Sequence, residues 1–316
     1  MPSFRTILVA ADFSEPSEEA FRIACTLAEE TKTRLFVLHA VEKTRVMEQP
    51  IAFNELGAPL PLPSGESAHH EALKERLLEV YAPNRPVDVE FRLHDGAAAD
   101  EILRLAGEVG ADLIVLGTHG RTGLRRLLTG SVAEAVLRRA SCPVLTFHVP
   151  AERPAGTGAV RVILHPTDFS ERAGGALKIA RSLARDLGAR LYLLFVDPVQ
   201  PIEAIALGGP LDPQGDLKFL AEMKAKTDGP DLKYPVEIRY EQGDPAQEIL
   251  RVAREIRCDL IVLGSHGRTG LGRLLMGSVA EAVLRRADCP SLIVKSTRPE
   301  PHEAKDESSQ QALRIY

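Results

Sequence analysis

The sequence predicts two α/β domains in tandem, each a doubly wound sheet of five parallel strands covered by helices. The chain repeats itself, since residues 113–145 and 260–292 differ at only five of 33 positions. In each copy, short runs of β-branched residues and leucine alternate with stretches that are apolar at every third or fourth position. The short runs are apolar throughout, which is typical of strands buried on both faces of a parallel sheet.

The expected strands follow these apolar runs along the chain. In the first copy they are Thr6–Ala10, Arg34–His39, Val87–Leu93, Asp112–Leu116 and Val144–Val149. In the second copy they are Val160–Leu164, Arg190–Phe195, Val236–Tyr240, Asp259–Leu263 and Leu292–Lys295. Helices are expected between the strands, because apolar spacings of three and four build one buried stripe. Examples are Glu18–Glu30, Glu101–Val109 and Val132–Arg139.

The repeat also predicts the domain boundaries. The opening segments of the two copies match at an offset of 156 residues, and the later segments match at an offset of 147. A period this long indicates two complete domains rather than a solenoid. We expect domains over residues 1–150 and 158–296, joined by a linker rich in turn residues. Residues 297–316 are polar and charged, so we expect a disordered tail there.

Charge and cysteine usage narrow the class of protein. The chain has 39 Lys and Arg against 44 Asp and Glu, a net charge of −5, so bulk electrostatic binding to nucleic acid or anionic membrane is not expected. No run approaches the roughly 18 consecutive apolar residues of a membrane helix. The four cysteines include no C-x-x-C pair, so we expect reduced cysteines in a cytoplasmic protein.

Glycines gather after the fourth strand of each copy. Glycine there lets backbone approach a ligand closely, and a Gly-Ser pair at a helix start exposes unpaired N–H groups at the positive end of the helix dipole. With arginines between them, these groups predict a phosphate cradle. The glycines and serines concerned are Gly117, Gly120, Gly130, Ser131, Gly264, Gly267, Gly277 and Ser278, and the arginines include Arg121 and Arg268.

Two familiar phosphate-binding motifs are missing from this pattern. No Gly-Lys-Ser/Thr follows the glycines, and no G-x-G-x-x-G is present. Chemistry of the P-loop ATPase type, with a lysine on the transferred phosphate, is therefore not supported.

The spacing G-x2-G-x9-G-[ST], with an aspartate just past the first strand, resembles the nucleotide-binding branch of the universal stress protein family in tandem form. The resemblance implies an adenine nucleotide alpha hydrolase-like fold with strand order 3-2-1-4-5. It also implies ATP, or ADP or AMP, held between the ends of strands one and four, with Mg²⁺ as a compatible addition carried by the phosphates. An independent rule places ligands of open α/β sheets at this same point of strand reversal.

The resemblance also implies the binding residues, none of them catalytic or metal-ligating. Residues facing the adenine or ribose would be Asp12, Ala40 and Gly117 in copy one, and Pro166, Asp168, Val196 and Gly264 in copy two. Residues binding phosphates would be Gly120, Gly130, Ser131 and Val132, and then Gly267, Gly277, Ser278 and Val279. Copy one departs from the family at two positions, with Ala10 where proline is frequent and Ala40 where valine is usual.

Each signal also has a purely structural interpretation. The glycine motif could be a tight strand–helix connection without a ligand. Asp12 and Asp168 could form an N-cap or an Asx turn ahead of the first helix, and that role is compatible with binding.

Three functions remain in competition at this stage. The leading hypothesis is a nucleotide-binding stress or regulatory protein without efficient catalysis, because no general base stands out in the motif. The alternatives are a slow ATPase or nucleotidyl transferase, and an interaction module without bound nucleotide.

The duplication also predicts the assembly. We expect the two copies to pack as an intramolecular pseudo-dimer, because the family commonly pairs fifth strands across a dimer. Val144–Val149 and Leu292–Lys295 are the matching segments here. Further homodimerisation and an unknown protein partner are compatible with this arrangement.

Overall fold

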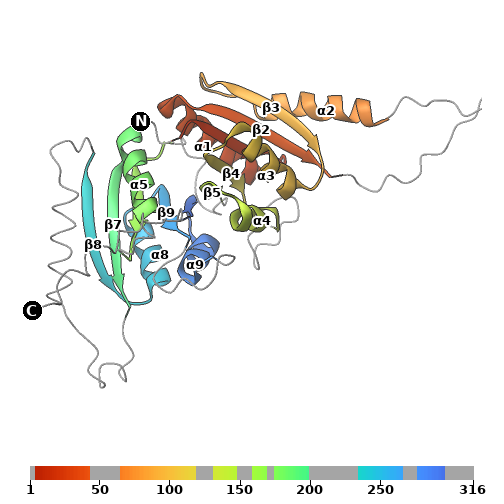
Figure 1. The fold of residues 1–316 in the computed structure, drawn as a ribbon. Helices are drawn as coiled ribbons and strands as arrows, with labels where there is room; N and C mark the ends of the chain where they lie inside the picture. Colours follow the sequence, from red (N-terminus) through yellow and green to blue (C-terminus); the bar gives the residue numbers. More distant parts are fainter. Residues whose placement is uncertain are drawn as a thin grey trace, which may run out of the picture.

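The computed structural model describes residues 4–42, 65–118, 131–147, 159–168, 174–198, 234–265 and 276–295. These residues form two α/β lobes, one from each copy of the repeat (Figure 1). The expected linker around residues 150–158 and the expected disordered tail at 297–316 lie outside the described residues. None of the helices in these ranges combines the length and hydropathy that spanning a bilayer requires.

Strands and helices alternate in the described parts of both lobes, except between β7 and β8, where residues 199–233 lie outside the described residues. The strands of the first lobe are β1 (Thr6–Ala10), β2 (Arg34–Val41), β3 (Val89–Asp95), β4 (Leu113–Gly117) and β5 (Val144–Phe147). Its helices are α1 (Glu15–Thr31), α2 (Gly65–Val80), α3 (Ala98–Val109) and α4 (Ser131–Arg139). The strands of the second lobe are β6 (Val162–Pro166), β7 (Arg190–Asp197), β8 (Val236–Gln242), β9 (Leu260–Gly264) and β10 (Ser291–Val294). Its described helices are α5 (Gly174–Leu187), α8 (Pro245–Glu255) and α9 (Ser278–Arg286).

Asp112, expected as the first residue of the fourth strand, lies just before β4 and has a different role. Its carboxylate accepts the backbone N–H of Arg5 at 2.8 Å and that of Thr6 at 3.1 Å. Asp259 makes the equivalent pair of bonds at the start of β6. In each lobe, a carboxylate that accepts two N–H groups in this way fixes where the central strand begins.

Other strand boundaries shift by two residues for local reasons. The N–H of Val87 donates to the carbonyl of Arg85 at 2.9 Å, so this residue belongs to a turn and β3 begins only at Val89. In the second lobe, β6 begins at Val162 rather than Val160 and continues to Pro166. Apolar runs predict that these segments are strands, but hydrogen bonds decide where each strand begins and ends.

The ten strands form one continuous sheet in the order β3-β2-β1-β4-β5-β10-β9-β6-β7-β8. Neighbouring strands are parallel within each lobe. The two lobes meet where β5 and β10 pair in the antiparallel direction. Each lobe therefore closes one edge of its sheet on the other lobe, which removes an exposed strand edge from both.

This pairing of β5 with β10, called the seam below, is symmetric. Leu145 pairs with Leu292, and these two residues are equivalent in the repeat because they are 147 positions apart. On one side of this pair Thr146 lies opposite Ser291, and on the other Val144 lies opposite Ile293. The Thr146 hydroxyl donates to the Ser291 carbonyl at 3.2 Å. Equivalent residues that face each other across an interface are the signature of two-fold packing.

A lysine of the second lobe reinforces the seam. The ammonium of Lys295 donates to the carbonyl oxygen of Arg138 at 2.8 Å, in the last turn of α4 in the first lobe. A cation suits the negative end of a helix dipole and satisfies a carbonyl that the helix leaves unpaired. Partial burial lowers the pKa of Lys295 from its ordinary value.

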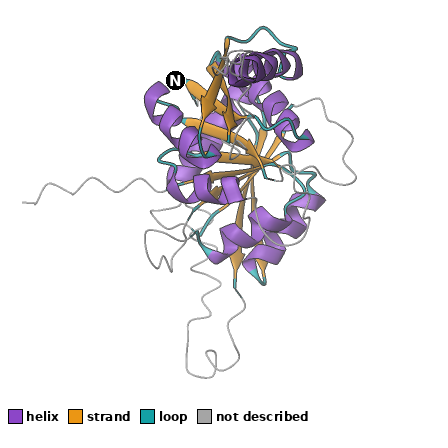
Figure 2. Ribbon diagram, turned by 90° about the vertical axis from the view of Figure 1, so that its right-hand side faces the viewer, coloured by secondary structure: helices purple, strands orange, loops and turns teal. Residues whose placement is uncertain are grey.

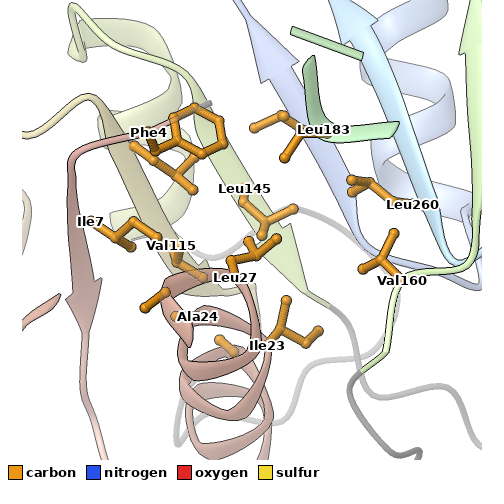
Figure 3. Packing of buried hydrophobic residues seen from close by; sticks show 14 of the residues in the cluster. Phe4, Ile7, Ile23, Ala24, Leu27, Val115, Leu145, Val160, Leu183 and Leu260 are labelled. Carbon is orange, nitrogen blue, oxygen red and sulfur yellow. The ribbon is translucent and has the colours of Figure 1, made fainter. Parts of the chain in front are cut away.

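Helices cover both faces of the sheet (Figure 2). One face packs against α1, α2 and α5, and the other packs against α3, α4, α8 and α9. On the first face a single cluster crosses the seam, and Figure 3 shows Leu27 of α1, Leu145 of β5 and Leu183 of α5 within it. The two lobes therefore share one hydrophobic core on this face.

We predict that Leu145→Ala and Leu292→Ala each lower the free energy of unfolding by about 2–5 kcal/mol, because each leaves a cavity in a fully packed core. Directly paired side chains share that cavity, so the double variant should lose less than the sum of the two single losses. Denaturant unfolding of the four proteins measures both quantities. Strict additivity would show that the two leucines do not pack together.

Candidate functional site

The candidate site lies where the strand order reverses. In the first lobe the chain moves from β1 outward to β2 and β3 and then returns to the other side of β1 to form β4. In the second lobe β6 occupies the same position between β7 and β9. The carboxyl ends of the two strands at such a reversal border a crevice in open α/β sheets, because their connections leave toward opposite faces.

Seven of the predicted residues lie in or just after the carboxyl ends of β1, β2 and β4, or of β6, β7 and β9. Three are in the first lobe and four in the second: Asp12, Ala40, Gly117, Pro166, Asp168, Val196 and Gly264. Five further predicted residues begin or precede α4 and α9: Ser131, Val132, Gly277, Ser278 and Val279. The remaining predicted residues lie outside the described residues: Gly120, Arg121, Gly130, Gly267 and Arg268.

Asp12 forms the Asx turn that the sequence left open as a structural interpretation. Its Oδ1 accepts the backbone N–H of Ser14 at 3.0 Å and also the Ser14 hydroxyl. Ser14 is the N-cap residue of α1, yet its hydroxyl makes no capping bond to the helix. A carboxylate that accepts through one oxygen still offers lone pairs on the other. The turn therefore positions Asp12 and leaves Oδ2 able to accept a further hydrogen bond.

A relay of hydrogen bonds holds the turn after β1 against the end of α2. The backbone N–H of Phe13 donates to the Tyr81 hydroxyl at 3.0 Å, and the Tyr81 and Ser17 hydroxyls are 2.8 Å apart. The Ser17 hydroxyl in turn donates to the Ala10 carbonyl at 3.1 Å. The order of donors then runs from Phe13 through Tyr81 and Ser17 to Ala10. Burial raises the pKa of Tyr81, which keeps its hydroxyl protonated as this order requires.

Phe13 adopts the left-handed backbone conformation, with φ of 62°, which is uncommon for an aromatic residue. Its ring lies 4.6 Å from the His39 ring, and the Arg76 guanidinium lies 4.3 Å from its centroid. These contacts offset the backbone strain and hold the Phe13 ring in place next to Asp12 in the chain. Sequence reasoning did not identify Tyr81 or Ser17, because nothing in the spacing links the end of α2 to the start of α1.

Ala40 and Val196 lie near the ends of β2 and β7 at equivalent positions. Ala40 pairs with His94 of β3, and Val196 pairs with Glu241 of β8. Both side chains are half-buried. Their backbone therefore stands at the carboxyl edge of the sheet, as the predicted contact with adenine requires.

Gly117, the last residue of β4, has a packing reason to be glycine. A Cβ at this position would lie 2.8 Å from the carbonyl carbon of Pro16 and 2.9 Å from the backbone nitrogen of Ser17. The first turn of α1 therefore passes directly over the end of β4. Gly117 therefore packs against α1, and the strand–helix connection that the motif could form at residues 119–130 lies outside the described residues.

The starts of α4 and α9 are the part of the candidate site whose chemistry suits an anion. Gly277 is the N-cap residue of α9, and its N–H donates to the Ser265 carbonyl at 2.8 Å. This bond fixes the helix start next to the end of β9. Ser278 and Val279 follow in the first turn, where backbone N–H groups have no partner within the helix. Such groups bind anions, and the helix dipole favours negative charge there.

The acidic residue in the first turn of each of these helices is paired. Glu134 of α4 accepts from Arg138 at 2.7 Å, and Glu281 of α9 accepts from Arg285 at 2.5 Å. Ion pairs of this kind direct the carboxylates along the helix, away from its start. Within the described ranges, no group of three or more His, Cys, Asp or Glu side chains is arranged to hold a metal ion.

His165 is a fully buried histidine on β6, beside the second strand reversal. Its Nδ1 lies 2.9 Å from the Val262 carbonyl oxygen, and its Nε2 makes no hydrogen bond within the described structure. Burial lowers the pKa of His165 to about 4, so the ring is neutral at pH 7. The first lobe has Val9 at the equivalent position.

A family model and curated relatives of the chain agree on one protein family. The family model described as "Universal stress protein family" matches residues 3–148 and 159–295. Universal stress protein MJ0531 of Methanocaldococcus jannaschii is 34% identical over 155 residues, covering 46% of this chain and 88% of the relative. Universal stress protein Rv2005c of Mycobacterium tuberculosis is 28% identical over 302 residues, covering 92% of this chain and 97% of the relative.

A solved structure resembles the chain over both lobes. The crystal structure of a universal stress protein from Archaeoglobus fulgidus superposes with a TM-score of 0.66 and covers 95% of this chain and 98% of that chain. The two sequences are 22% identical. This likeness supports the tandem α/β fold.

We predict that Gly117→Ala lowers the free energy of unfolding by about 1–3 kcal/mol, because its Cβ would clash with the backbone of α1. Gly107→Ala is the matched control, since a Cβ on this exposed helical residue meets nothing within 4 Å. That control should stabilise the protein by about 0.5–1 kcal/mol, because alanine favours a helix over glycine. Thermal or denaturant unfolding separates the two outcomes, and equal effects would refute the packing explanation for Gly117.

We also predict that His165 contributes an acid-sensitive part of the stability. Its pKa in the folded protein is about 4, below the ordinary value of 6.5, so the unfolded chain binds a proton first. The contribution of His165 to the free energy of unfolding is fully present above pH 6.5. It decreases as the pH falls toward 4, by up to about 1.4 kcal/mol per pH unit. The unfolding free energy of wild type relative to that of His165→Asn, measured at several pH values, should therefore decrease as the pH falls. A relative stability that is independent of pH would contradict this.

Proposed function

Because the chain belongs to the universal stress protein family, we propose that it binds ATP or a related adenine nucleotide at its two strand reversals. One site lies at the carboxyl ends of β1 and β4, and the other lies at those of β6 and β9. Binding serves a regulatory role in the stress response without efficient catalysis. The observation that carries the proposal is the start of α9, which Gly277 ties to the end of β9 through the Ser265 carbonyl.

The chemistry of the described residues fits the phosphate end of such a ligand. The first-turn N–H groups of Ser278 and Val279, together with the Ser278 hydroxyl, are donors without a competing carboxylate, because Glu281 is directed to Arg285. Ser131 and Val132 stand at the same place in α4. Donors at a helix start suit a polyphosphate chain, whose own oxygens would carry any accompanying Mg²⁺.

The nucleoside end would meet the strand ends. Asp12 is held by its Asx turn, with lone pairs left for an amino or hydroxyl group of the ligand. Asp168 follows Pro166 and Thr167 at the equivalent place in the second lobe. Carboxylates at both reversals give each site an acceptor that a nucleoside can satisfy.

Two titratable side chains of the described residues beside the reversals, Tyr81 and His165, support binding without turnover. Burial raises the pKa of Tyr81 and lowers that of His165 to about 4, so neither group exchanges a proton readily near pH 7. The seam between β5 and β10 supports a pseudo-dimer within one chain, in which nucleotide at either site can bias the geometry of both lobes. The four buried, unpaired cysteines suit a reducing compartment, and we propose a cytoplasmic location.

The test is calorimetric titration of the full chain with ATP, ADP, AMP and cyclic AMP, with and without Mg²⁺. Wild type should bind ATP at two sites. Gly277→Val should lose the site of the second lobe, with at least tenfold weaker binding there. Its circular dichroism should match wild type, because valine accepts the extended φ of −62° and ψ of 146° at this N-cap. Gly107→Ala, remote from both reversals, is the control and should keep both sites.

Two outcomes would replace the proposal. Steady phosphate release that disappears in a Gly130 and Gly277 double variant would indicate a slow ATPase or nucleotidyl transferase. The absence of any binding heat, together with no adenine nucleotide in the denatured purified protein, would indicate an interaction module.

A further inference from the structure

The central strands of the two lobes differ at one pair of neighbouring residues. At the offset of 156, Val9 and Ala10 of β1 correspond to His165 and Pro166 of β6. Both side chains of each pair lie at the end of the strand, two or three residues before the aspartate of the candidate site. A proline in the middle of a sheet removes a ladder hydrogen bond and is expected only where another group compensates.

The strand pairing shows which hydrogen bond is missing. β1 and β4 pair as far as Ala10 and Leu116, and in this parallel register the Ala10 N–H donates to the Val115 carbonyl. β6 and β9 pair only as far as Leu164 and Ile261. Pro166 has no N–H, so the carbonyl that corresponds to Val115 loses its backbone donor. At the offset of 147 that carbonyl belongs to Val262.

His165 supplies a donor to this same carbonyl. Its Nδ1 lies 2.9 Å from the Val262 oxygen, and the ring is completely buried. A carbonyl oxygen only accepts, so Nδ1 carries the proton. We propose that His165 is a positioning residue whose ring N–H replaces the backbone N–H that Pro166 lacks, and so holds the end of β6 on β9.

The orphaned Nε2 agrees with this role. A buried acceptor without a partner costs free energy, and within the described residues Nε2 has none, so the ring's hydrogen bond is the one made by Nδ1. Burial also lowers the pKa of the ring to about 4, which leaves the neutral form dominant at pH 7. The hydrogen bond from Nδ1 to the Val262 carbonyl offsets the free-energy cost of burying the ring.

The proposal rests on the proposed function in one respect, because it concerns how the second site is built. Beyond Pro166, the N–H of Thr167 donates to the Leu194 carbonyl of β7 at 2.9 Å. The end of β6 is therefore held on β7 by its backbone and on β9 by the His165 side chain. Both contacts precede Asp168, so loss of the bond to Val262 would let the approach to that carboxylate move.

The test is a double-mutant cycle on the full chain with His165→Val, Pro166→Ala and both together, the last reproducing the Val-Ala pair of the first lobe. With Pro166 present, His165→Val should lower the folding equilibrium constant at least tenfold, or about 1.4 kcal/mol, because a buried carbonyl loses its partner. In the Pro166→Ala background, the restored backbone N–H should limit the loss to less than about threefold. Equal losses in the two backgrounds would overturn the proposal.

Two further measurements keep the proposal testable if His165→Val with Pro166 does not fold. His165→Asn places an amide N–H near the position of Nδ1, so it should keep the equilibrium constant within about threefold of wild type. Nitrogen NMR of the wild-type ring should show Nδ1 protonated at pH 7, and a proton on Nε2 would refute the assignment.

Nucleotide titration separates this inference from the proposed function. His165→Val should weaken ATP binding at the second site and leave the first site unchanged, whereas the Val-Ala double variant, which reproduces the first lobe, should bind at the second site more tightly than His165→Val alone. If wild type binds no nucleotide, the proposed function fails while the unfolding cycle still decides the role of His165. If the cycle is additive and nucleotide still binds twice, the positioning role alone fails.

Discussion

The hydrogen-bonded pairing of β5 with β10 makes ten strands into one sheet and joins the two lobes, each with its own candidate site. A five-stranded sheet with an open edge at its fifth strand would expose unpaired N–H and carbonyl groups beside α4 or α9. Pairing of the two edges buries Leu145 and Leu292 against each other and lets α1 and α5 share one core. Lys295 adds a bond from one lobe to the end of α4 in the other. Both strand reversals therefore belong to one continuous hydrogen-bonded sheet.

Much of this fold could be predicted from the sequence. The duplication is visible in the near identity of residues 113–145 and 260–292, and each apolar run in the described residues became a strand. The first and last residues of the strands were harder to predict, because they depend on hydrogen bonds between segments that are distant in the sequence. Asp112, expected inside a strand, instead accepts two N–H groups from the start of β1. No local pattern distinguishes a carboxylate that begins a strand from one that precedes it.

The candidate site rests on motif spacing, and its binding role stays a prediction. Among the described residues, the aspartates follow the central strands, and the start of α9 is tied to the end of β9. The Asx turn at Asp12 and the tight contact at Gly117 show that motif residues also perform structural work. Tyr81 and Ser17 were missed because their partnership links the end of one helix to the start of another across 64 residues. The exchange of Val9 and Ala10 for His165 and Pro166 is visible in the alignment of the copies, but its meaning depends on strand register.

The symmetry of the seam also bears on how such a chain could have arisen. Since Leu145 and Leu292 are equivalent positions that face each other, either lobe presents a surface complementary to itself. An ancestral single lobe could have used that surface to associate with a second copy, at a rate and extent set by its abundance. Gene fusion then replaces an encounter between molecules with a tether, so the pair forms at any expression level. Once tethered, the two lobes no longer have to remain identical, and one can acquire a proline and a histidine that the other never needs.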